Sequence, residues 1–169
     1  MTNQIDSTLN DSSAEALVIQ RVFDAPVVDV WKAWTDPERF MRWWGPADYT
    51  CPACKIDLRV GGKYLACMRS PEGQDMWSGG VYRQIDAPQR LVFTDHFADA
   101  NGNLVPDEQF GMGGVWPVEL LVILTFTETE DRKTLFTLRH EGIPPGDGRD
   151  ATAAGWEQSF DKLAKSLRG

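Results

Sequence analysis

Two side chains that could exchange protons with a bound molecule lie in strand-like rows of the sequence. Asp95 lies in LVFTDHF and His140 ends TLFTLRH. Because successive side chains of a strand point to opposite faces, the alternation in these rows sends both to the apolar side, as it does Tyr64. A carboxylate and an imidazole that converge in an apolar pocket could orient a ligand, or act as acid and base. Alternatively, Asp95 lies near solvent and His140 bonds the backbone near Glu141.

A second set of residues is rich in aromatic rings and methionine. The chain holds 7 tryptophans among 169 residues, more than one domain of this size needs for packing. Such side chains are typical of a pocket for an apolar ligand, although each of them could equally be core. The residues predicted to contact a ligand are Trp43, Trp44, Tyr64, Met68, Trp77, Phe93, Phe97, Phe110, Met112, Trp116, Trp156 and Phe160.

The cysteines do not indicate metal or disulfide chemistry. Cys51 and Cys54 have the spacing of a redox pair, but in an extended segment their sulfurs would lie roughly 10 Å apart on opposite faces. A second pair for zinc is missing, and Cys67 makes the count odd at 3. We expect free thiols, no metal and no cofactor.

Charge and hydropathy narrow the choice of partners. The chain carries 17 basic and 25 acidic residues, a net charge of −8, which disfavours contact with nucleic acid. No apolar run approaches the roughly 20 residues that span a bilayer, and the first residues lack the pattern of a signal peptide. We therefore expect a cytoplasmic protein without membrane insertion.

The order of the predicted elements indicates one α+β domain. Residues 1–14 are polar and are predicted to form a disordered tail before a single domain at 15–169. A first strand at 17–23 is followed by two short helices, the second with Asp36 as its N-cap and Gly45 as its stop. Further strands are predicted at about 49–59, 63–69, 76–85, 90–97, 117–128 and 133–140, with a bulge permitted at Gly79 and Gly80.

A long amphipathic helix is predicted from about Gly148 to Leu167. Its apolar stripe consists of Ala151, Ala154, Trp156, Phe160, Leu163, Ala164 and Leu167. Seven strands need a cover on one face, and this helix has the only apolar stripe long enough to provide it. We predict a curved antiparallel seven-stranded sheet around the C-terminal helix, with an apolar cavity between them and the long loop 98–116 as a lid.

Five rows, in order along the chain, resemble one known family. The chain is similar to the Aha1-like (activator of Hsp90 ATPase homologue 1-like) branch of the START-like, or SRPBCC, superfamily in VFDAPVVDVWKAWTDPERFMRWWGP, KIDLRVGGKY, GGVYRQIDAPQRLVFT, LRHEGIP and GWEQSFDKLAKSL. The resemblance covers about residues 15–169. It implies a helix-grip fold with a deep hydrophobic cavity, in a superfamily whose members bind lipids, sterols or hormones, or catalyse polyketide cyclisation.

Three functions are compatible with these observations. The leading hypothesis is binding of a hydrophobic or aromatic small molecule in the cavity. The second is a cyclase-like or hydrolytic enzyme that uses Asp95 and His140, and the third is a protein-binding module that contacts a chaperone, as the resemblance to Aha1 suggests. A homodimer formed through a strand edge or the outer face of the sheet is compatible with each of them.

Overall fold

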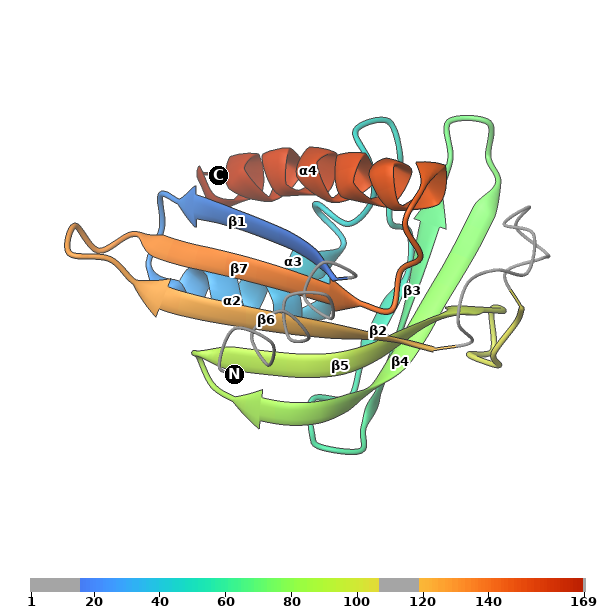
Figure 1. Cartoon of the computed structure of the whole chain (residues 1–169), viewed down its shortest axis with the longest axis horizontal. Helices are drawn as coiled ribbons and strands as arrows, with labels where there is room; N and C mark the ends of the chain where they lie inside the picture. Colours follow the sequence, from blue (N-terminus) through green and yellow to red (C-terminus); the bar gives the residue numbers. More distant parts are fainter. Residues whose placement is uncertain (1–15, 107–118, 169) are drawn as a thin grey trace, which may run out of the picture.

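The computed structural model describes residues 16–106 and 119–168 (Figure 1). The predicted tail at 1–14 and residues 107–116 of the predicted loop lie outside the described residues. The elements follow in the order β1 (Leu17–Phe23), α2 (Val27–Thr35), α3 (Pro37–Phe40), β2 (Cys54–Ile56), β3 (Lys63–Arg69), β4 (Asp75–Asp86), β5 (Arg90–Ala98), β6 (Leu120–Glu128), β7 (Thr134–Glu141) and α4 (Asp147–Arg168).

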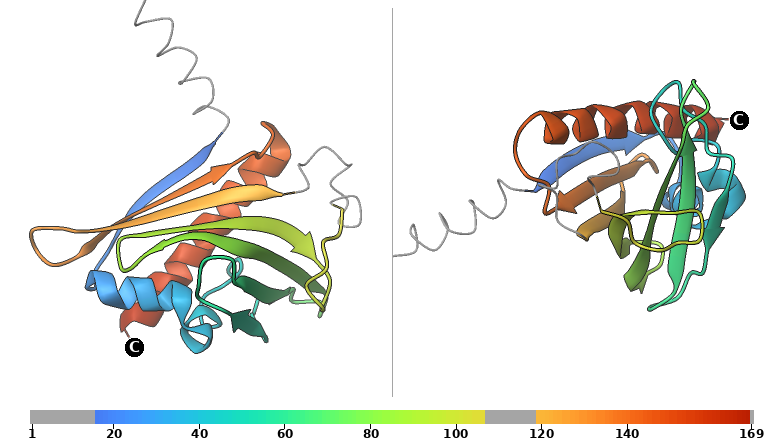
Figure 2. Two further views of the ribbon diagram at one scale, coloured as in Figure 1. Left: turned by 90° about the horizontal axis from the view of Figure 1, so that it is seen from below. Right: turned by 90° about the vertical axis from the view of Figure 1, so that its right-hand side faces the viewer.

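The strands form one sheet with the order β1-β7-β6-β5-β4-β3-β2. Every neighbouring pair is antiparallel, so β2 to β7 are a meander and β1 adds to its far edge beside β7. Helix α4 lies along the sheet next to β1, and the sheet curves beneath it (Figure 2). The predicted α+β helix-grip architecture, with two short helices after the first strand, is confirmed.

Helices α2 and α4 pack on the same face of the sheet. The ring of Phe136 on β7 lies 5.8 Å from the ring of Trp34 on α2 and 5.1 Å from the ring of Phe160 on α4. The rings of Trp34 and Phe160 are themselves 6.3 Å apart. One aromatic cluster therefore joins both helices to the concave face and forms the centre of the core.

The N-cap predicted for the second short helix is confirmed, but α3 ends at Phe40, with Met41 as its C-cap, and not at Gly45. The carboxylate of Asp36 accepts a hydrogen bond from the backbone N–H of Glu38, which satisfies a donor at the start of α3. Gly45 has φ +104°, a left-handed conformation that glycine adopts without strain. The chain can therefore turn sharply after Trp44 and run toward β2.

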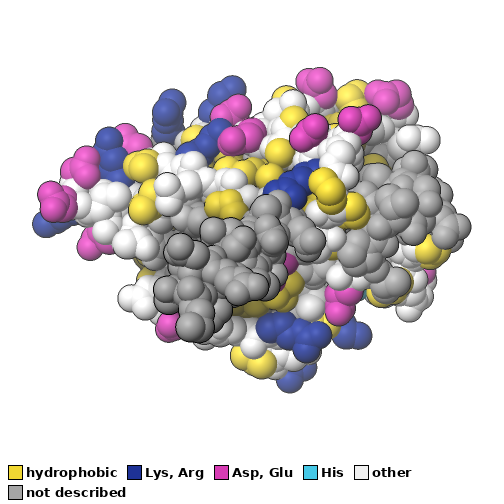
Figure 3. Space-filling model, viewed as in Figure 1, with side chains coloured by type: hydrophobic (Ala, Val, Ile, Leu, Met, Phe, Trp, Pro, Cys, Tyr) yellow, Lys and Arg dark blue, Asp and Glu magenta, His cyan; other side chains and the backbone are white. Residues whose placement is uncertain are grey.

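Charges on α4 suit the direction of its dipole. Asp147 and Asp150 lie in its first turn, and Lys165 and Arg168 in its last turn. Along the edge of the molecule that α4 occupies, acidic side chains gather near the start of the helix and basic ones nearer its end (Figure 3). In the described part of the chain, no helix is long and apolar enough to cross a membrane.

The alternation of side chains is confirmed in the strands that face the helices. Leu120, Val122, Leu124 and Phe126 of β6 are buried, as are Phe136, Leu138 and His140 of β7. Some details differ from the prediction. Cys67 is buried although the alternation places it outside, and the register shift in β4 falls between Tyr82 and Gln84 instead of at the two glycines.

Gly80 lies where β4 passes very close to its neighbours in the sheet. A Cβ atom added at this position would overlap the backbone carbonyl of Thr94 on β5 and lie 2.9 Å from a ring carbon of Tyr64 on β3. Beside it, the backbone N–H of Val81 donates a hydrogen bond to the side-chain hydroxyl of Thr94 (2.9 Å). The glycine therefore permits a close approach that the curvature of the sheet uses.

We predict that Gly80→Ala lowers the free energy of unfolding by about 1–3 kcal/mol or more, because the methyl group must displace backbone. Gly155→Ala is the matched control, since a Cβ atom there meets nothing closer than 3.7 Å. In a helix this change should raise the free energy of unfolding by about 0.5–1 kcal/mol. Urea denaturation measures both, and equal stabilities of Gly80→Ala and the natural protein would contradict the argument.

Candidate functional site

The two halves of α4 meet the sheet differently. In the C-terminal half, Phe160 and Leu163 are fully buried in the aromatic core. In the first turns, the residues that face the sheet are small, at the helical spacing of Gly148, Ala151 or Thr152, and Gly155. Such short side chains do not reach the strands, so a space remains under the first half of the helix.

This space is a cavity of about 410 Å³. Its walls come from α4, from the turn after α3, and from the ends of β3, β4, β5, β6 and β7 that lie beneath the start of α4. The residues that line it are Trp44, Gly45, Pro46, Tyr49, Met68, Met76, Trp77, Ser78, Asp95, His96, Phe97, Leu120, His140, Gly148, Ala151, Thr152, Gly155, Trp156 and Ser159. Most of the lining is apolar, and its titratable side chains on the strands are Asp95 and His96 of β5 and His140 of β7.

The predicted ligand contacts divide into two groups. Trp44, Met68, Trp77, Phe97 and Trp156 line the cavity. Trp43, Tyr64, Phe93 and Phe160 are instead buried in the core and do not line the cavity. Phe110, Met112 and Trp116 lie outside the described residues.

The difference between Trp43 and Trp44 shows how neighbouring tryptophans take separate roles. Trp43 is fully buried, its indole N–H donates to the backbone carbonyl of Ala33 (2.9 Å), and its ring lies 4.6 Å from that of Trp34. Trp44 is half-buried and stacks on Phe40 with the ring centres 4.5 Å apart. The first ring is therefore part of the core, and the second presents a surface to the cavity.

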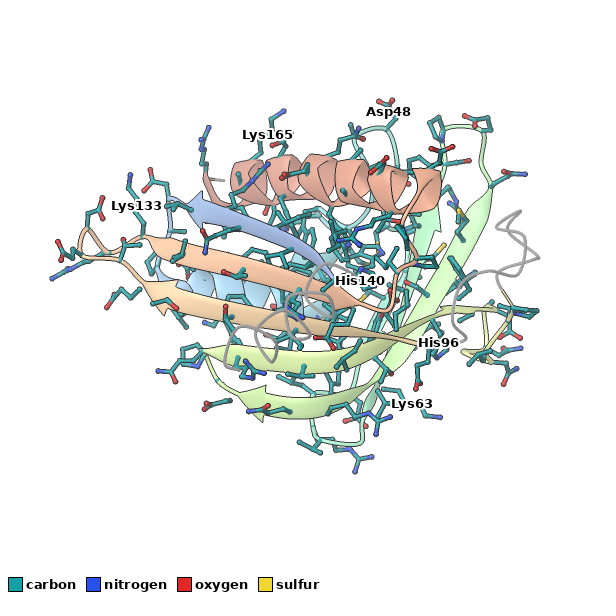
Figure 4. All side chains as sticks on the ribbon, in the orientation of Figure 1. Asp48, Lys63, His96, Lys133, His140 and Lys165 are labelled. Carbon is teal, nitrogen blue, oxygen red and sulfur yellow. The ribbon has the colours of Figure 1, made fainter. Side chains whose placement is uncertain are left out.

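The two candidate acid–base residues meet at the cavity wall. Nε2 of His140 lies 3.3 Å from Oδ2 of Asp95, and Oδ1 of Asp95 accepts a hydrogen bond from the hydroxyl of Tyr64 (2.9 Å). The indole N–H of Trp156 donates to Nδ1 of His140 (3.2 Å). His140 is therefore bonded to α4 and not to the backbone near Glu141, and Figure 4 shows it on β7 at the end of the sheet where α4 begins.

The bond from Trp156 determines where the proton of His140 lies. An indole N–H only donates, so Nδ1 of His140 must offer its lone pair. The neutral imidazole then carries its proton on Nε2, which faces Asp95. His140 is only 2% exposed, and its Nε2 makes no hydrogen bond of good geometry to any described residue, because the contact with Asp95 is close but poorly aligned.

Tyr64 remains a hydrogen-bond donor in this environment. Burial raises the pKa of its hydroxyl well above the ordinary value, and the nearby carboxylate of Asp95 raises it further. The phenol therefore keeps its proton at neutral pH and holds one oxygen of Asp95. The ring of Tyr64 also lies 5.3 Å from that of Phe93, which fixes it in the core.

Some residues of the site were not predicted from the sequence. His96 lines the cavity although alternation along β5 places it outside, and its ring lies against Gly79, which has no side chain to exclude it. Met76, Leu120 and the small residues at the start of α4 were also not predicted. A signal for the last group was present, since Gly148, Thr152 and Gly155 fall at helical spacing next to the large residues of the stripe.

Lys162 holds the turn after α3 against α4. Its Nζ donates to the carbonyls of Gly45 (3.0 Å), Pro46 (3.1 Å) and Tyr49 (2.9 Å). Burial lowers the pKa of this ammonium group. Gly45, Pro46 and Tyr49 belong to the cavity lining, so Lys162 fixes one wall of the cavity from outside it.

The thiols are suited to packing and not to chemistry. Cys51, Cys54 and Cys67 are free. Burial raises the pKa of Cys51 and Cys67 to about 11 and that of Cys54 to about 12, so thiolates are scarce at neutral pH. Nowhere in residues 16–106 and 119–168 do three His, Cys, Asp or Glu side chains form a group that could hold a metal ion.

Comparison with known proteins identifies the family. Residues 24–168 match the family described as Activator of Hsp90 ATPase homolog 1-like protein. The chain belongs to this family. Its START-like fold is generally ligand-binding, in agreement with a cavity between the sheet and α4. Among curated proteins, none matches the sequence.

Solved structures of similar proteins share the fold. Protein CV1439 from Chromobacterium violaceum is 26% identical with a TM-score of 0.73, over 92% of this chain and 99% of that one. Protein NE0264 from Nitrosomonas europaea is 25% identical with a TM-score of 0.71, over 90% and 94% of the two chains. CalU16 from Micromonospora echinospora is 26% identical with a TM-score of 0.61, over 90% and 75%.

We predict that Lys162→Met lowers the free energy of unfolding by about 1–2 kcal/mol, because three backbone carbonyls lose a charged donor that is partly screened by solvent. Lys165→Met is the matched control, since Lys165 is exposed on the same helix (Figure 4). Chemical denaturation compares the two. The same loss of stability in both variants would show that Lys162 holds no special contact.

Proposed function

We propose that the protein binds a hydrophobic or aromatic small molecule in the cavity between the sheet and the first turns of α4. The observation that carries this proposal is the cavity itself. Its volume of about 410 Å³ falls in the range of small-molecule pockets, roughly 300–1,000 Å³. Apolar and aromatic walls with a few convergent polar groups are also typical of such pockets.

The walls of the cavity are supported from behind by the core. Trp156 stacks on Phe160 with ring centres 5.5 Å apart and an interplanar angle of 23°. Trp44 stacks on Phe40, and the rings of Trp44 and Trp156 meet edge to face at 5.4 Å. Because these rings are already held in place, a ligand would lose little free energy to ordering them.

The contacts of His140 favour binding over acid–base catalysis. A general base needs a free lone pair, and the lone pair on Nδ1 of His140 accepts the N–H of Trp156. The proton is therefore on Nε2, which lies 3.3 Å from Oδ2 of Asp95 but forms no well-aligned hydrogen bond with it. In this arrangement the imidazole is a hydrogen-bond donor to the cavity, and His140 could act as a base only after it had left Trp156.

We predict that Gly155→Phe abolishes ligand binding without unfolding the protein. Gly155 lines the cavity from α4, and a Cβ atom there has room, so a larger side chain extends into the space that a ligand would occupy. Titration of tryptophan fluorescence with a panel of lipids, flavonoids and polyketides measures binding to the natural protein. Any ligand that binds is then tested against the variant.

Ala154→Phe is the matched control, because Ala154 is the preceding residue of α4 and is exposed. It adds the same ring to the same helix on the solvent side, so affinity should stay within about threefold of the natural protein, under ~0.7 kcal/mol. If every ligand in the panel fails to bind the natural protein, the proposal is wrong. It is also wrong if Gly155→Phe, still folded, binds as the natural protein does.

A further inference from the structure

One hydrogen-bond donor and one acceptor face the same corner of the cavity. The donor is Nε2–H of His140, which is buried and has no well-aligned partner among the described residues. The acceptor is the carboxylate of Asp95, whose Oδ2 lies 3.3 Å from that nitrogen. Both residues belong to the cavity lining.

Nε2 of His140 cannot become an acceptor by a change of tautomer. Trp156 donates to the opposite ring nitrogen and so keeps the proton on Nε2. A buried N–H without a partner is costly, since folding removes it from water without replacing the lost bond. The structure therefore keeps an unsatisfied donor that a ligand atom inside the cavity can satisfy.

The carboxylate of Asp95 can also accept further hydrogen bonds. An ionised carboxylate offers about four lone-pair sites. The hydroxyl of Tyr64 uses one of them on Oδ1, and the side chain of Asp95, which lines the cavity, is 21% exposed. Sites on the carboxylate thus remain for a donor that a ligand brings.

We propose that the ligand is a neutral, apolar molecule with a hydroxyl group, a phenol or an alcohol, whose oxygen accepts from His140 and donates to Asp95. This inference rests on the proposed function and specifies its ligand class. Two atoms 3.3 Å apart can both lie within hydrogen-bond distance of a single oxygen. A hydroxyl is the simple group that accepts and donates at one atom.

Other polar groups fit this corner less well. A carboxylate would be repelled by Asp95 and by the net charge of −8. A carbonyl or an ether would accept from His140 but would turn its lone pairs toward those of Asp95. An ammonium group could pair with Asp95 but would leave Nε2–H of His140 unsatisfied.

Three ligands of nearly one shape test the inference on the natural protein. They are 2-naphthol, which donates and accepts, 2-methoxynaphthalene, which only accepts, and 2-methylnaphthalene, which does neither. Dissociation constants are measured by isothermal titration calorimetry at one pH and salt concentration. We expect 2-naphthol to bind about ten- to a hundred-fold more tightly than 2-methylnaphthalene, as two added hydrogen bonds would give, and about tenfold more tightly than 2-methoxynaphthalene, which lacks only the bond to Asp95.

Asp95→Asn tests the acceptor with little change in shape. The amide oxygen can still accept from Tyr64, and its NH₂ group then faces the cavity as a donor. The advantage of 2-naphthol over 2-methoxynaphthalene should fall to about threefold or less, under ~0.7 kcal/mol. Asp86→Asn is the matched control, because it removes the same charge from an exposed position at the end of β4 and should keep the full preference.

The outcomes separate this inference from the proposed function. Equal affinity of the natural protein for all three ligands contradicts the hydroxyl inference and leaves the apolar cavity as a binding site. Binding of none of them contradicts the proposed function and the inference with it. A preference for 2-naphthol that survives in folded Asp95→Asn also overturns the assigned role of the carboxylate.

Discussion

The seating of α4 on the sheet is the constraint on which the site depends. Large side chains in the second half of the helix, above all Phe160 and Leu163, are buried in the aromatic core and fix the axis of the helix over the strands. The small side chains in the first turns of α4 are too short to fill the gap between the helix axis, held at this position, and the strands. The cavity is therefore a consequence of how residue size changes along one face of a single helix, and Lys162 fixes one of its walls by bonding the turn after α3.

Trp156 contacts the core, the cavity and the polar cluster that His140, Asp95 and Tyr64 form. Its ring stacks on Phe160, its surface lines the cavity, and its N–H holds His140. Placing an imidazole, a carboxylate and a phenol beside a core costs stability. Apolar residues of similar volume would avoid this cost, which distinguishes the cluster from the rest of the core.

The sequence predicted the architecture better than the site. The alternation of apolar residues predicted β6 and β7, and apolar residues at helical spacing predicted α4, because burial of one face leaves a regular pattern. The same alternation placed Asp95 and His140 on one side of the sheet. The pattern could not separate core from cavity: Trp43 and Trp44 are adjacent in the sequence, and only the packing of Trp34 and Phe40 decides which ring is buried. The predicted strand at 49–59 is only three residues long as β2, and Ala154 is exposed, since edges and helix rotation are set by tertiary contacts.

Fluorine NMR of protein labelled with 5-fluorotryptophan can show whether a ligand binds beneath α4, because the tryptophans report on core and cavity separately. When a naphthalene-sized ligand is added, we predict large shifts for Trp44, Trp77 and Trp156, which line the cavity. Resonances of Trp31 and Trp34, which lie in the core, should move little. Shifts confined to the core tryptophans, or no shift at Trp156 when the ligand is bound, would contradict a binding site beneath the first turns of α4.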